Sequence, residues 1–458
     1  MPTITLSLSL SLLILFILYK YLFHPLFLSP LSKIPAAHFT APLSPTWISA
    51  LRDAGKETVT IHALHAKHGP VVRLAPRELS VNSACGLRDI YKRGAMEKHP
   101  LYSELFVNFK TGNLVGLLGG KEHARQKRML SRVYSKSFLW ESWDLRVVGG
   151  VVLGRLVGVL GKAAEKGEGE SVNVLPLFQA VGMDFTSGFV FGVGNGTKFL
   201  GDLGGWETWL GEYEWFKHAG LDERAGGFIE RWCLDLCRRT ETQRGSDSNM
   251  KSDPVVYDSL RSGLEKSPDS RPIDLAVASE LLDHLIAGHE TSGITFTYIM
   301  WELSQRPALQ DELRQELLTL QPQLHYQALT KDGISLPHPS TIDSLPLLDA
   351  IIRETLRLHA PAASPLPRVT PDVPGGVSID GFDGIPGGTT VSSSAYTLHR
   401  IEEVYPHPTE WLPQRWIDPG PEKHDMRRLW WPFGSGGRMC LGSNFALQGN
   451  SSGSNVRC

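Results

Sequence analysis

The glycine-rich run at residues 433–442, FGSGGRMCLG, constrains this chain more than any other part of its sequence. Three glycines within four residues allow the backbone to turn tightly and to approach another group closely. Backbone N–H groups in such a turn can point at an anion, and a following helix N-terminus favours a thiolate over a thiol. Cys440 stands in that position, just before an apolar helical stretch at 441–447. A lone cysteine near glycines is usually an inert buried thiol, but the combined spacing of Phe, Gly, Arg and Cys favours a functional thiolate here.

The N-terminus differs from everything that follows it. Residues 4–23 are rich in Leu, Ile and Phe, and Lys20 is their only charged residue. Twenty helical residues rise about 30 Å, the thickness of a bilayer core. A cleaved signal peptide would need a positively charged start, and the opening residues MPT have none. Because Lys20 and Lys33 lie at or beyond the end of the apolar run, we predict a single-pass anchor at 1–23 with the rest of the chain in the cytosol.

Two further segments complete the predicted domain organisation. Residues 24–45 contain five prolines, which predict a stiff hinge between the anchor and the soluble part. Residues 46–458 then form one large domain. The formal net charge of -2 gives no global basic field, so we expect no nucleic-acid partner. Five scattered cysteines argue against a disulfide framework and fit a reducing compartment.

The order of predicted elements is mostly helical. The longest predicted helix runs from Asp274, its N-cap, to Gln305, and Pro307 prevents its continuation. Two strand-rich regions flank the helices, which predicts a mainly α (α+β) fold and not a doubly wound sheet. Further helices are expected at 121–136, 308–320 and 347–358, strands at 62–78 and 365–391, and surface loops at 244–272 and 321–346.

The pattern Phe433-x-x-Gly436-x-Arg438-x-Cys440 resembles the haem-binding signature of the cytochrome P-450 family. Four further motifs extend this resemblance over most of the chain. The resemblance implies a helical haem domain with a smaller strand-rich region and haem b as the cofactor. It also implies that Cys440 is the axial thiolate ligand of the iron, that Arg438 holds a haem propionate, and that Phe433 packs beside the sulfur.

Glu354 and Arg357 are three residues apart and can pair on one helix face. Alone this pattern is weak, since most such pairs are surface ion pairs. Arg415 adds weight, because the family has a buried Glu-Arg-Arg triad with this spacing. The resemblance therefore implies a structural triad of Glu354, Arg357 and Arg415. The family's usual Glu is replaced by Gln414, which leaves the triad itself intact.

The segment Ala287–Ser292 lies midway along the longest predicted helix. Glycine and adjacent hydroxyls loosen a helix, and an acid beside an alcohol could relay protons. Without other signals these would be ordinary helix residues. The family places this segment over the distal haem face, which implies that Glu290 and Thr291 are catalytic. We expect His289 to line the pocket wall or to face solvent, and not to bind iron.

Residues 121–136 hold six Lys or Arg and one Glu. Such a face is usually only solvated. In the family, an aromatic residue and an arginine of this helix pair with a propionate, and His123 and Lys127 occupy those places. Lysine is the weaker partner for a planar anion. The rest of the basic face could dock an acidic electron donor. Arg368 resembles a strand arginine of the family that meets a propionate.

The resemblance, to fungal microsomal members in particular, implies a monooxygenase of the endoplasmic reticulum membrane. It would insert one atom of dioxygen into an apolar small molecule, in secondary metabolism, with electrons from NADPH through a flavoprotein reductase. An oxygen-independent haem-thiolate isomerase or dehydratase is an alternative, against which Glu290 and Thr291 argue. A non-catalytic remnant is a third possibility.

The end of the sequence departs from the family pattern. Cys440 is followed by 18 residues, and the apolar helical pattern stops at Gln448. The family normally continues this helix and adds a strand pair whose loop enters the substrate pocket. We therefore expect a truncated C-terminus, with the domain incomplete after residue 448 and reduced packing beneath the haem.

Overall fold

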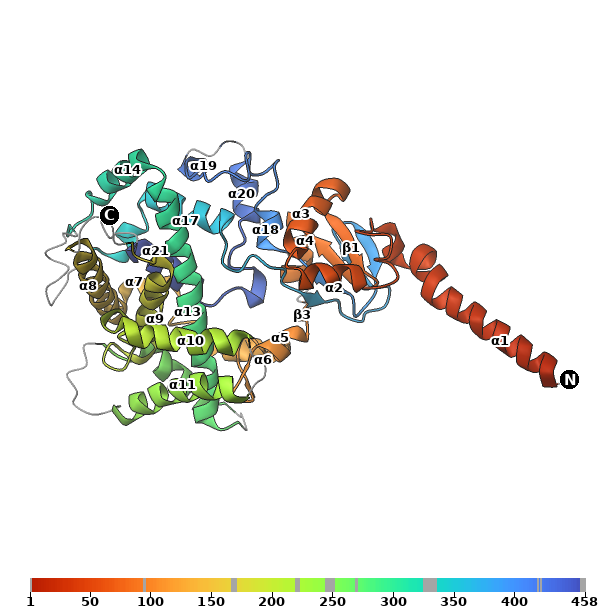
Figure 1. Ribbon diagram of the computed structural model, residues 1–458, viewed down its shortest axis with the longest axis horizontal. Helices are drawn as coiled ribbons and strands as arrows, with labels where there is room; N and C mark the ends of the chain where they lie inside the picture. The colour runs from red at the N-terminus through yellow and green to blue at the C-terminus, as the bar shows by residue number, and fades with distance from the viewer. Residues whose placement is uncertain are drawn as a thin grey trace.

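The computed structural model describes residues 2–93, 96–165, 171–218, 223–243, 252–267, 271–323, 336–417, 420 and 422–453. A helical rod at the N-terminus projects away from the body of the molecule (Figure 1). The rod consists of α1 (Pro2–Leu18) and a π-helical segment, η1 (Tyr19–Leu28), in which Pro25 interrupts α-helical bonding. Its stretch Ser9–Leu28 has a mean hydropathy of 1.8 and is unburied, so it is a candidate membrane span.

Two other described helices are long and apolar enough to cross a membrane. They are α8 (Trp143–Glu165) and α9 (Val174–Phe191). In contrast to the rod, 39% and 78% of their apolar windows are buried inside the protein. Their apolar residues therefore serve the core, whereas the apolar stretch Ser9–Leu28 of the rod is unburied.

A small strand-rich lobe follows the rod. Its main sheet has the strand order β1-β2-β9-β6-β3, in which β2 and β9 run parallel and the other neighbours antiparallel. Leu31 and Ile34, just after the rod, are buried in the core of this lobe. The elements of the lobe are η2 (Pro30–Lys33), α2 (Thr46–Asp53), α3 (Glu57–His68), β1 (Val71–Ala75), β2 (Glu78–Val81), α4 (Ala84–Leu87), η3 (Arg88–Arg93), β3 (Glu97–Lys98), β6 (Arg368–Val369), β7 (Val377–Ile379), β8 (Phe382–Ile385), β9 (Thr390–Ser392) and α18 (Ala395–Leu398).

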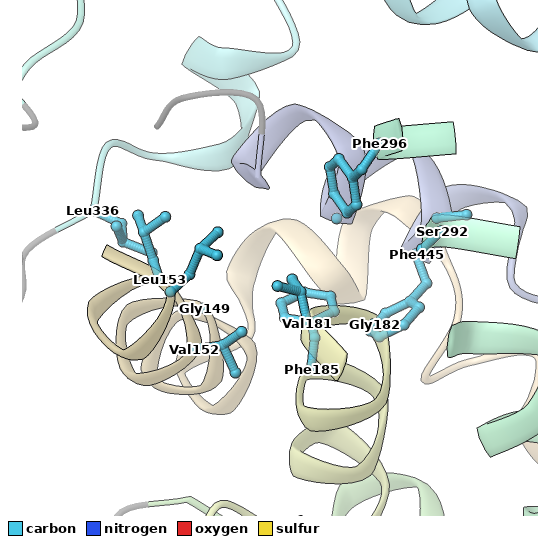
Figure 2. A pocket seen from close by; sticks show the side chains of 13 residues that line it. Gly149, Val152, Leu153, Val181, Gly182, Phe185, Ser292, Phe296, Leu336 and Phe445 are labelled. Carbon is cyan, nitrogen blue, oxygen red and sulfur yellow. The ribbon is translucent and has the colours of Figure 1, made fainter. Parts of the chain in front are cut away.

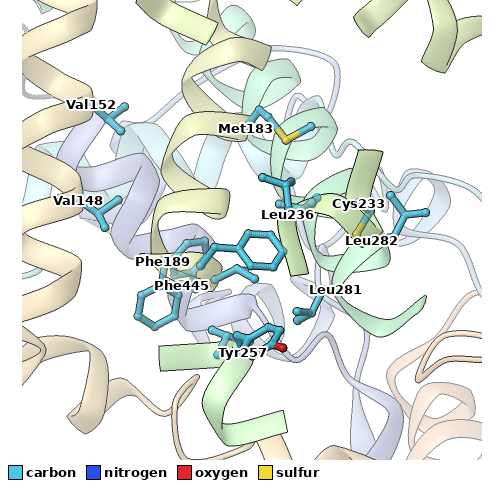
Figure 3. Close-up of a cluster of buried hydrophobic side chains, with 14 of the residues drawn as sticks. Val148, Val152, Met183, Phe189, Cys233, Leu236, Tyr257, Leu281, Leu282 and Phe445 are labelled. Atoms are coloured by element: carbon cyan, nitrogen blue, oxygen red, sulfur yellow. The ribbon is translucent and has the colours of Figure 1, made fainter. Parts of the chain in front are cut away.

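The larger lobe is helical and surrounds α13 (Ile273–Ser304), which packs along α9. Glycines permit this close approach: a Cβ at Gly288 would lie 2.1 Å from Thr186 Oγ1, and one at Gly182 would lie 2.9 Å from Gly288 O. Phe189, Phe445 and Leu281 belong to the same apolar core (Figure 3). The lobe contains α8, α9, α13, α5 (Leu101–Leu105), β4 (Val107–Asn108), β5 (Thr111–Gly112), α6 (Gly120–Leu130), α7 (Lys136–Glu141), η4 (Phe199–Gly201), α10 (Leu203–His218), α11 (Glu223–Gln243), α12 (Val255–Glu265), α14 (Pro307–Leu317), α16 (Pro339–Ile342), α17 (Pro346–Leu358), α19 (Gln414–Ile417), α20 (Lys423–Leu429), η5 (Gly436–Arg438) and α21 (Ser443–Gly453).

The predicted mainly α fold with a smaller strand-rich region is confirmed, but several boundaries differ. The expectation of strands over 62–78 is wrong in its first part, because α3 extends to His68. Glu57 in its first turn and Lys67 in its last turn suit the helix dipole. Gly69, with a φ of 94°, then ends the helix.

The predicted surface loop at 244–272 contains a helix, α12. Val256, Leu260 and Leu264 lie four residues apart and are all buried, so one face of α12 joins the core. Polar residues around this face obscure its period in the sequence. Residues 244–251 and 268–270 lie outside the described part of the chain.

Helix ends account for the remaining differences. Asp274 lies in the first turn of α13 and is not its N-cap, because the helix begins at Ile273. The predicted basic helix at 121–136 is two helices, since α6 ends at Leu130 and α7 begins at Lys136. The predicted loop at 321–346 includes the short α16 and the start of α17, and its residues 324–335 lie outside the described part. Finally, α21 continues past Gln448 to Gly453, because each added residue of an anchored helix gains a backbone hydrogen bond.

Candidate functional site

The Cys440 loop, residues 433–442, is a tight turn that closes on itself. The Cys440 N–H donates a hydrogen bond of 2.9 Å to Phe433 O. Gly434 and Gly436 have φ values of 68° and 71°, which favour glycine. A Cβ at Gly436 would also lie 2.0 Å from the Tyr91 carbonyl oxygen. Glycine at 436 therefore allows the loop to pack against η3 of the strand-rich lobe.

The Cys440 side chain borders open space on one side and protein on the others. Desolvation by the surrounding protein raises the pKa of its thiol, whereas a hydrogen bond from the Gly442 backbone N–H and the charge of Lys127 lower it. Helix α21 begins three residues later, at Ser443. A cation on the open side would favour the thiolate, as a metal ion does for a coordinating thiol.

Five basic side chains gather beside this loop, and we call them the cation cluster: Lys98, His123, Lys127, Arg368 and Arg438. They come from β3, α6, β6 and η5. Their closeness is evident in the pKa of His123, which burial lowers to about 3 with further contributions from all four other members. Burial and the charge of Arg368 likewise lower the pKa of Arg438.

Backbone carbonyl groups are the main hydrogen-bond acceptors for the cation cluster. Arg438 donates to Leu117 O at 3.2 Å and to Leu118 O at 2.7 Å. Lys127 donates to Gly437 O at 3.1 Å and Met439 O at 2.8 Å, both within the Cys440 loop. Arg368 donates to Pro367 O at 2.9 Å and lies 3.4 Å from the Tyr102 hydroxyl.

The cation cluster therefore has surplus positive charge. Within the described residues, no carboxylate forms an ion pair with any of its members. The Nδ1 atom of His123 is also buried without a hydrogen-bond partner. Buried charges are normally paired, so this cluster fits an anionic ligand. The two carboxylates of haem, beside a thiolate that gains from a cation, match this donor set.

Glu354, Arg357 and Arg415 are in direct contact. Glu354 Oε1 accepts from Arg357 Nη2 at 2.8 Å and from Arg415 Nε at 3.0 Å. Its Oε2 accepts from Arg357 Nε and from Trp416 Nε1, both at 2.9 Å. Both oxygens of this fully buried carboxylate are thus saturated. The cluster joins α17 to α19 and has no open side for a ligand.

His399 links this cluster to the Cys440 loop. Its Nδ1 lies 2.9 Å from Arg357 O, and its Nε2 lies 2.7 Å from the Trp431 backbone N. The Trp431 indole N–H in turn donates to Ser435 Oγ at 3.0 Å. Because Nε2 must accept, the proton of the neutral ring belongs on Nδ1. The chain of contacts thus runs from the arginine cluster to the start of the Cys440 loop.

Glu290 and Thr291 are adjacent on α13, but their side chains have different partners. Glu290 Oε1 pairs with Lys217 Nζ of α10 at 2.6 Å. Thr291 Oγ1 donates to Ala287 O at 2.7 Å. Burial alone would lower the pKa of Lys217, but the hydrogen bond and charge of Glu290 raise it. The same carboxylate also hydrogen-bonds Tyr213.

His289 differs from its expected place. It does not face solvent, because it is fully buried. Its ring makes edge contacts with Trp206, Trp209 and Tyr213 at centroid distances of 5.8, 5.3 and 5.1 Å. Burial lowers its pKa to about 4, so it stays neutral near pH 7. Its role in the structure is to pack α13 against α10.

One face of α13 remains accessible although the helix is central. Ala287 is exposed midway along it, between the fully buried Leu285 and His289. Asp283 lies one turn before Ala287 on the same side, Glu290 and Ile294 follow at helical spacing, and all three are partly accessible. This side of α13 therefore borders open space, as expected of a helix beside a ligand-binding site.

A separate apolar cavity of about 40 Å³ lies between α8, α9, α13 and α21 (Figure 2). Val152, Val181, Phe185, Phe296 and Phe445 contribute to its walls. None of the residues predicted for the functional site lines it, so the cavity is distinct from the Cys440 loop and the cation cluster.

Sequence reasoning missed Lys98, His399 and Lys217. Lys98 and Lys217 lie in segments without a recognisable motif, and their partners are distant in the sequence. His399 precedes Arg400 in a short helix-and-turn region that carries no chemical pattern by itself. Only tertiary contacts reveal these three residues.

The comparisons with known proteins agree with this geometry. The family model "Cytochrome P450" matches residues 236–449. The chain is 29% identical over 408 residues to cytochrome P-450 monooxygenase avaI of Aspergillus versicolor, covering 84% of this chain and 93% of the relative. It is also 29% identical over 462 residues to cytochrome P-450 monooxygenase hepC of Aspergillus oryzae, and the match covers 93% of this chain and 86% of the relative. The chain belongs to the cytochrome P-450 family of haem-thiolate monooxygenases.

Proposed function

We propose that this chain binds haem b through the Cys440 thiolate and inserts one atom of dioxygen into an apolar small molecule of fungal secondary metabolism. Electrons come from NADPH through a flavoprotein reductase. The observation that carries the proposal is the pairing of a glycine-rich thiolate loop with a cation cluster that has no carboxylate partner within the described part of the chain. The fungal monooxygenases among the relatives support the oxidative chemistry.

The members of the cation cluster hold the propionates. Arg438 and Arg368 supply planar guanidinium groups, the best partners for a carboxylate. His123 offers its unpaired Nδ1, while Lys127 also ties down the carbonyl groups that flank Cys440. Phe433 packs beside the sulfur, and Gly436 permits the loop to approach η3. When bound, haem would supply a site for dioxygen and the means to cleave the O–O bond of dioxygen. Electron donation from the thiolate favours that cleavage.

Glu290 and Thr291 deliver the protons that this chemistry consumes. Lys217 pairs with the Glu290 carboxylate and holds it on the α10 side. The Thr291 hydroxyl donates to Ala287 O, which leaves its oxygen able to accept a hydrogen bond from a proton carrier. An acid and an alcohol one residue apart on the accessible face of α13 thus form a short relay.

The N-terminal rod anchors the enzyme in the endoplasmic reticulum membrane with residues 46–458 in the cytosol. Its unburied apolar surface supports the anchoring. A cytosolic catalytic domain is where a reductase and NADPH are available. The basic residues of α6 and α7 offer that reductase a positively charged face.

The decisive experiment is a spectrum of the reduced, carbon monoxide-bound protein. A strongly red-shifted Soret band is expected, because a thiolate ligand produces it, and Cys440→Ser is expected to abolish it. A folded wild-type protein without this band contradicts haem-thiolate function and favours a remnant. NADPH- and oxygen-dependent turnover then separates a monooxygenase from an oxygen-independent isomerase.

A further inference from the structure

Lys98 occupies an unfavourable place for a lysine. Strand β3 pairs with β6 so that Lys98 stands directly opposite Arg368. Both are buried, with relative exposures of 7% and 4%. Like charges directly opposite across strands destabilise a sheet, and burial strengthens that repulsion because less water screens it. A purely structural role does not explain why two cations face one another here.

The hydrogen bonds of Lys98 leave its charge uncompensated. Its Nζ donates to Leu114 O at 3.0 Å and to Val115 O at 2.7 Å. The Tyr102 ring lies 5.4 Å from the amine. These groups orient the ammonium without carrying a negative charge.

The two nearest acidic groups belong to α13, and each is hydrogen-bonded through one oxygen, whereas Glu280 Oε1 and Asp283 Oδ2 are buried without a hydrogen-bond partner among the described residues. Glu280 Oε2 accepts from Leu114 N at 2.7 Å and from Gln126 Nε2 at 2.6 Å. Asp283 Oδ1 accepts from Asn108 at 2.9 Å, and burial and the charge of Glu280 raise the pKa of Asp283. Neither forms an ion pair with Lys98 among the described residues.

Two cations and these two acids surround the amine. Arg368 of β6 and Arg438 of η5 face Lys98, and neutral His123 of α6 lies next to them. Burial first, and then Arg438 and Arg368, lower the pKa of Lys98 to about 7, while Glu280 and Asp283 act in the opposite direction. Near neutral pH the amine is thus divided between its charged and neutral forms.

We propose that Lys98 is a further ligand for the haem propionates and that haem binding draws a proton onto its amine. This inference rests on the proposed haem-binding function. The amine takes the proton from the medium, and the resulting ammonium donates to a propionate oxygen. Because the anion raises the proton affinity of Lys98, the contribution of Lys98 to haem affinity is complete below about pH 7 and falls as pH rises above that value.

The inference has two consequences of opposite sign. Without haem, replacing Lys98 by Met removes a buried charge that repels Arg368, so the apoprotein becomes more stable. With haem, the same change removes a charge-assisted hydrogen bond and weakens binding, about 10- to 100-fold. A lysine with a merely structural role would shift both quantities in the same direction.

The test compares wild type, Lys98→Met, Lys98→Arg and the exposed control Lys67→Met. Urea unfolding of each apoprotein gives its stability, and titration with haem and with haem dimethyl ester gives the affinities. Calorimetry in buffers of different ionisation enthalpy at pH 8 counts the protons taken up. Proton release from Cys440 is common to all four proteins and cancels in the differences.

Lys98→Met is expected to raise apoprotein stability and to weaken haem binding, but to bind the dimethyl ester as wild type does. It should also take up nearly one proton fewer than wild type when haem binds. Lys98→Arg should bind haem well without that uptake, since arginine is always charged. Equal haem affinity and equal proton uptake in wild type and Lys98→Met would overturn the inference about Lys98 and leave the proposed function standing. Failure of the wild type to bind haem would sink the proposed function as well.

Discussion

Two groups of arginines in this molecule, each with one buried and one partly buried member, have opposite electrostatics. At Glu354, the guanidinium groups of Arg357 and Arg415 share one carboxylate whose two oxygens are saturated. In the cation cluster, Arg368 and Arg438 have carbonyl or hydroxyl partners and no carboxylate within the described residues. The first group is complete without a ligand, whereas the second needs one.

This difference separates two uses of a buried charge. When a pair that is complete in the folded chain is broken by substitution, the folded state loses stability, because the remaining buried charge has no partner. A cluster that is incomplete lowers the stability of the empty protein and returns that free energy when the anion binds. Each substitution below therefore has a different expected balance between stability and haem affinity.

Glu354→Gln is the strongest test of the complete group. It keeps the shape of the side chain but leaves Arg357 and Arg415 buried without a counter-charge. We expect the free energy of unfolding to fall by about 3–5 kcal/mol, measured by urea denaturation of the apoprotein. Glu141→Gln, at a side chain that is 78% exposed, serves as the control and should change little. An apoprotein as stable as wild type would show that the carboxylate contributes no net stability.

Arg438→Met is the matching test of the incomplete group. The change removes a charge that Arg368 repels, so apoprotein stability should change by no more than about 1 kcal/mol. Haem affinity should fall roughly 10- to 100-fold, because a charge-assisted hydrogen bond to a propionate is lost. Haem titration and urea denaturation measure the two quantities. A large loss of stability with unchanged affinity would place Arg438 with the complete group.

Acid pH probes the link between the two groups. Burial lowers the pKa of His399 to about 3, so the folded protein holds this ring neutral while the unfolded chain protonates it near 6.5. The contribution of the neutral His399 ring to the free energy of unfolding is complete above pH 6.5. It is lost as pH falls from 6.5 towards 3, by about 1.4 kcal/mol per pH unit. His399→Gln should make the pH dependence of unfolding shallower by nearly one proton in this range.

A control is available at His407, whose side chain is 72% exposed. His407→Gln should leave the slope of stability against pH unchanged. An unchanged slope in His399→Gln would show that His399 does not carry the acid sensitivity. The Soret band of the carbon monoxide complex provides a second readout, because loss of the contact to Trp431 should disturb the Cys440 loop before the protein unfolds.

The sequence predicts a contact well when the residues that form it are close together in the chain, and poorly when they are far apart. The Cys440 loop and the Glu354–Arg357 spacing are local patterns, so their geometry is readable from neighbouring residues. The helix at Val255–Glu265 is missed because its four core positions are embedded in polar sequence. Lys98 opposes Arg368 only after β3 and β6 pair across 270 positions of sequence. Register and burial decide that contact, and no local pattern encodes either.

Lys217→Met tests a third, partly exposed arrangement and has the smallest expected effect on stability. Its side chain is 38% exposed and its partner Glu290 is 27% exposed. Water screens such a pair, so the free energy of unfolding should fall by less than about 1 kcal/mol. If Glu290 carries protons, however, losing the charge that holds it should lower the yield of product per NADPH. The loss should stay below that of Glu290→Gln, which removes a group of the kind worth about 10²–10⁴-fold in rate.

The measurement is the ratio of hydrogen peroxide released to NADPH consumed, determined across pH for Lys217→Met, Glu290→Gln and the exposed control Lys198→Met. A higher ratio in the first two, with unchanged haem affinity, is expected, since protons then reach the site too slowly and reduced oxygen escapes as peroxide. A ratio equal to wild type in Glu290→Gln would remove Glu290 from the relay. A normal ratio in Lys217→Met alone would instead mean that Tyr213, which also hydrogen-bonds Glu290, is sufficient to orient the carboxylate.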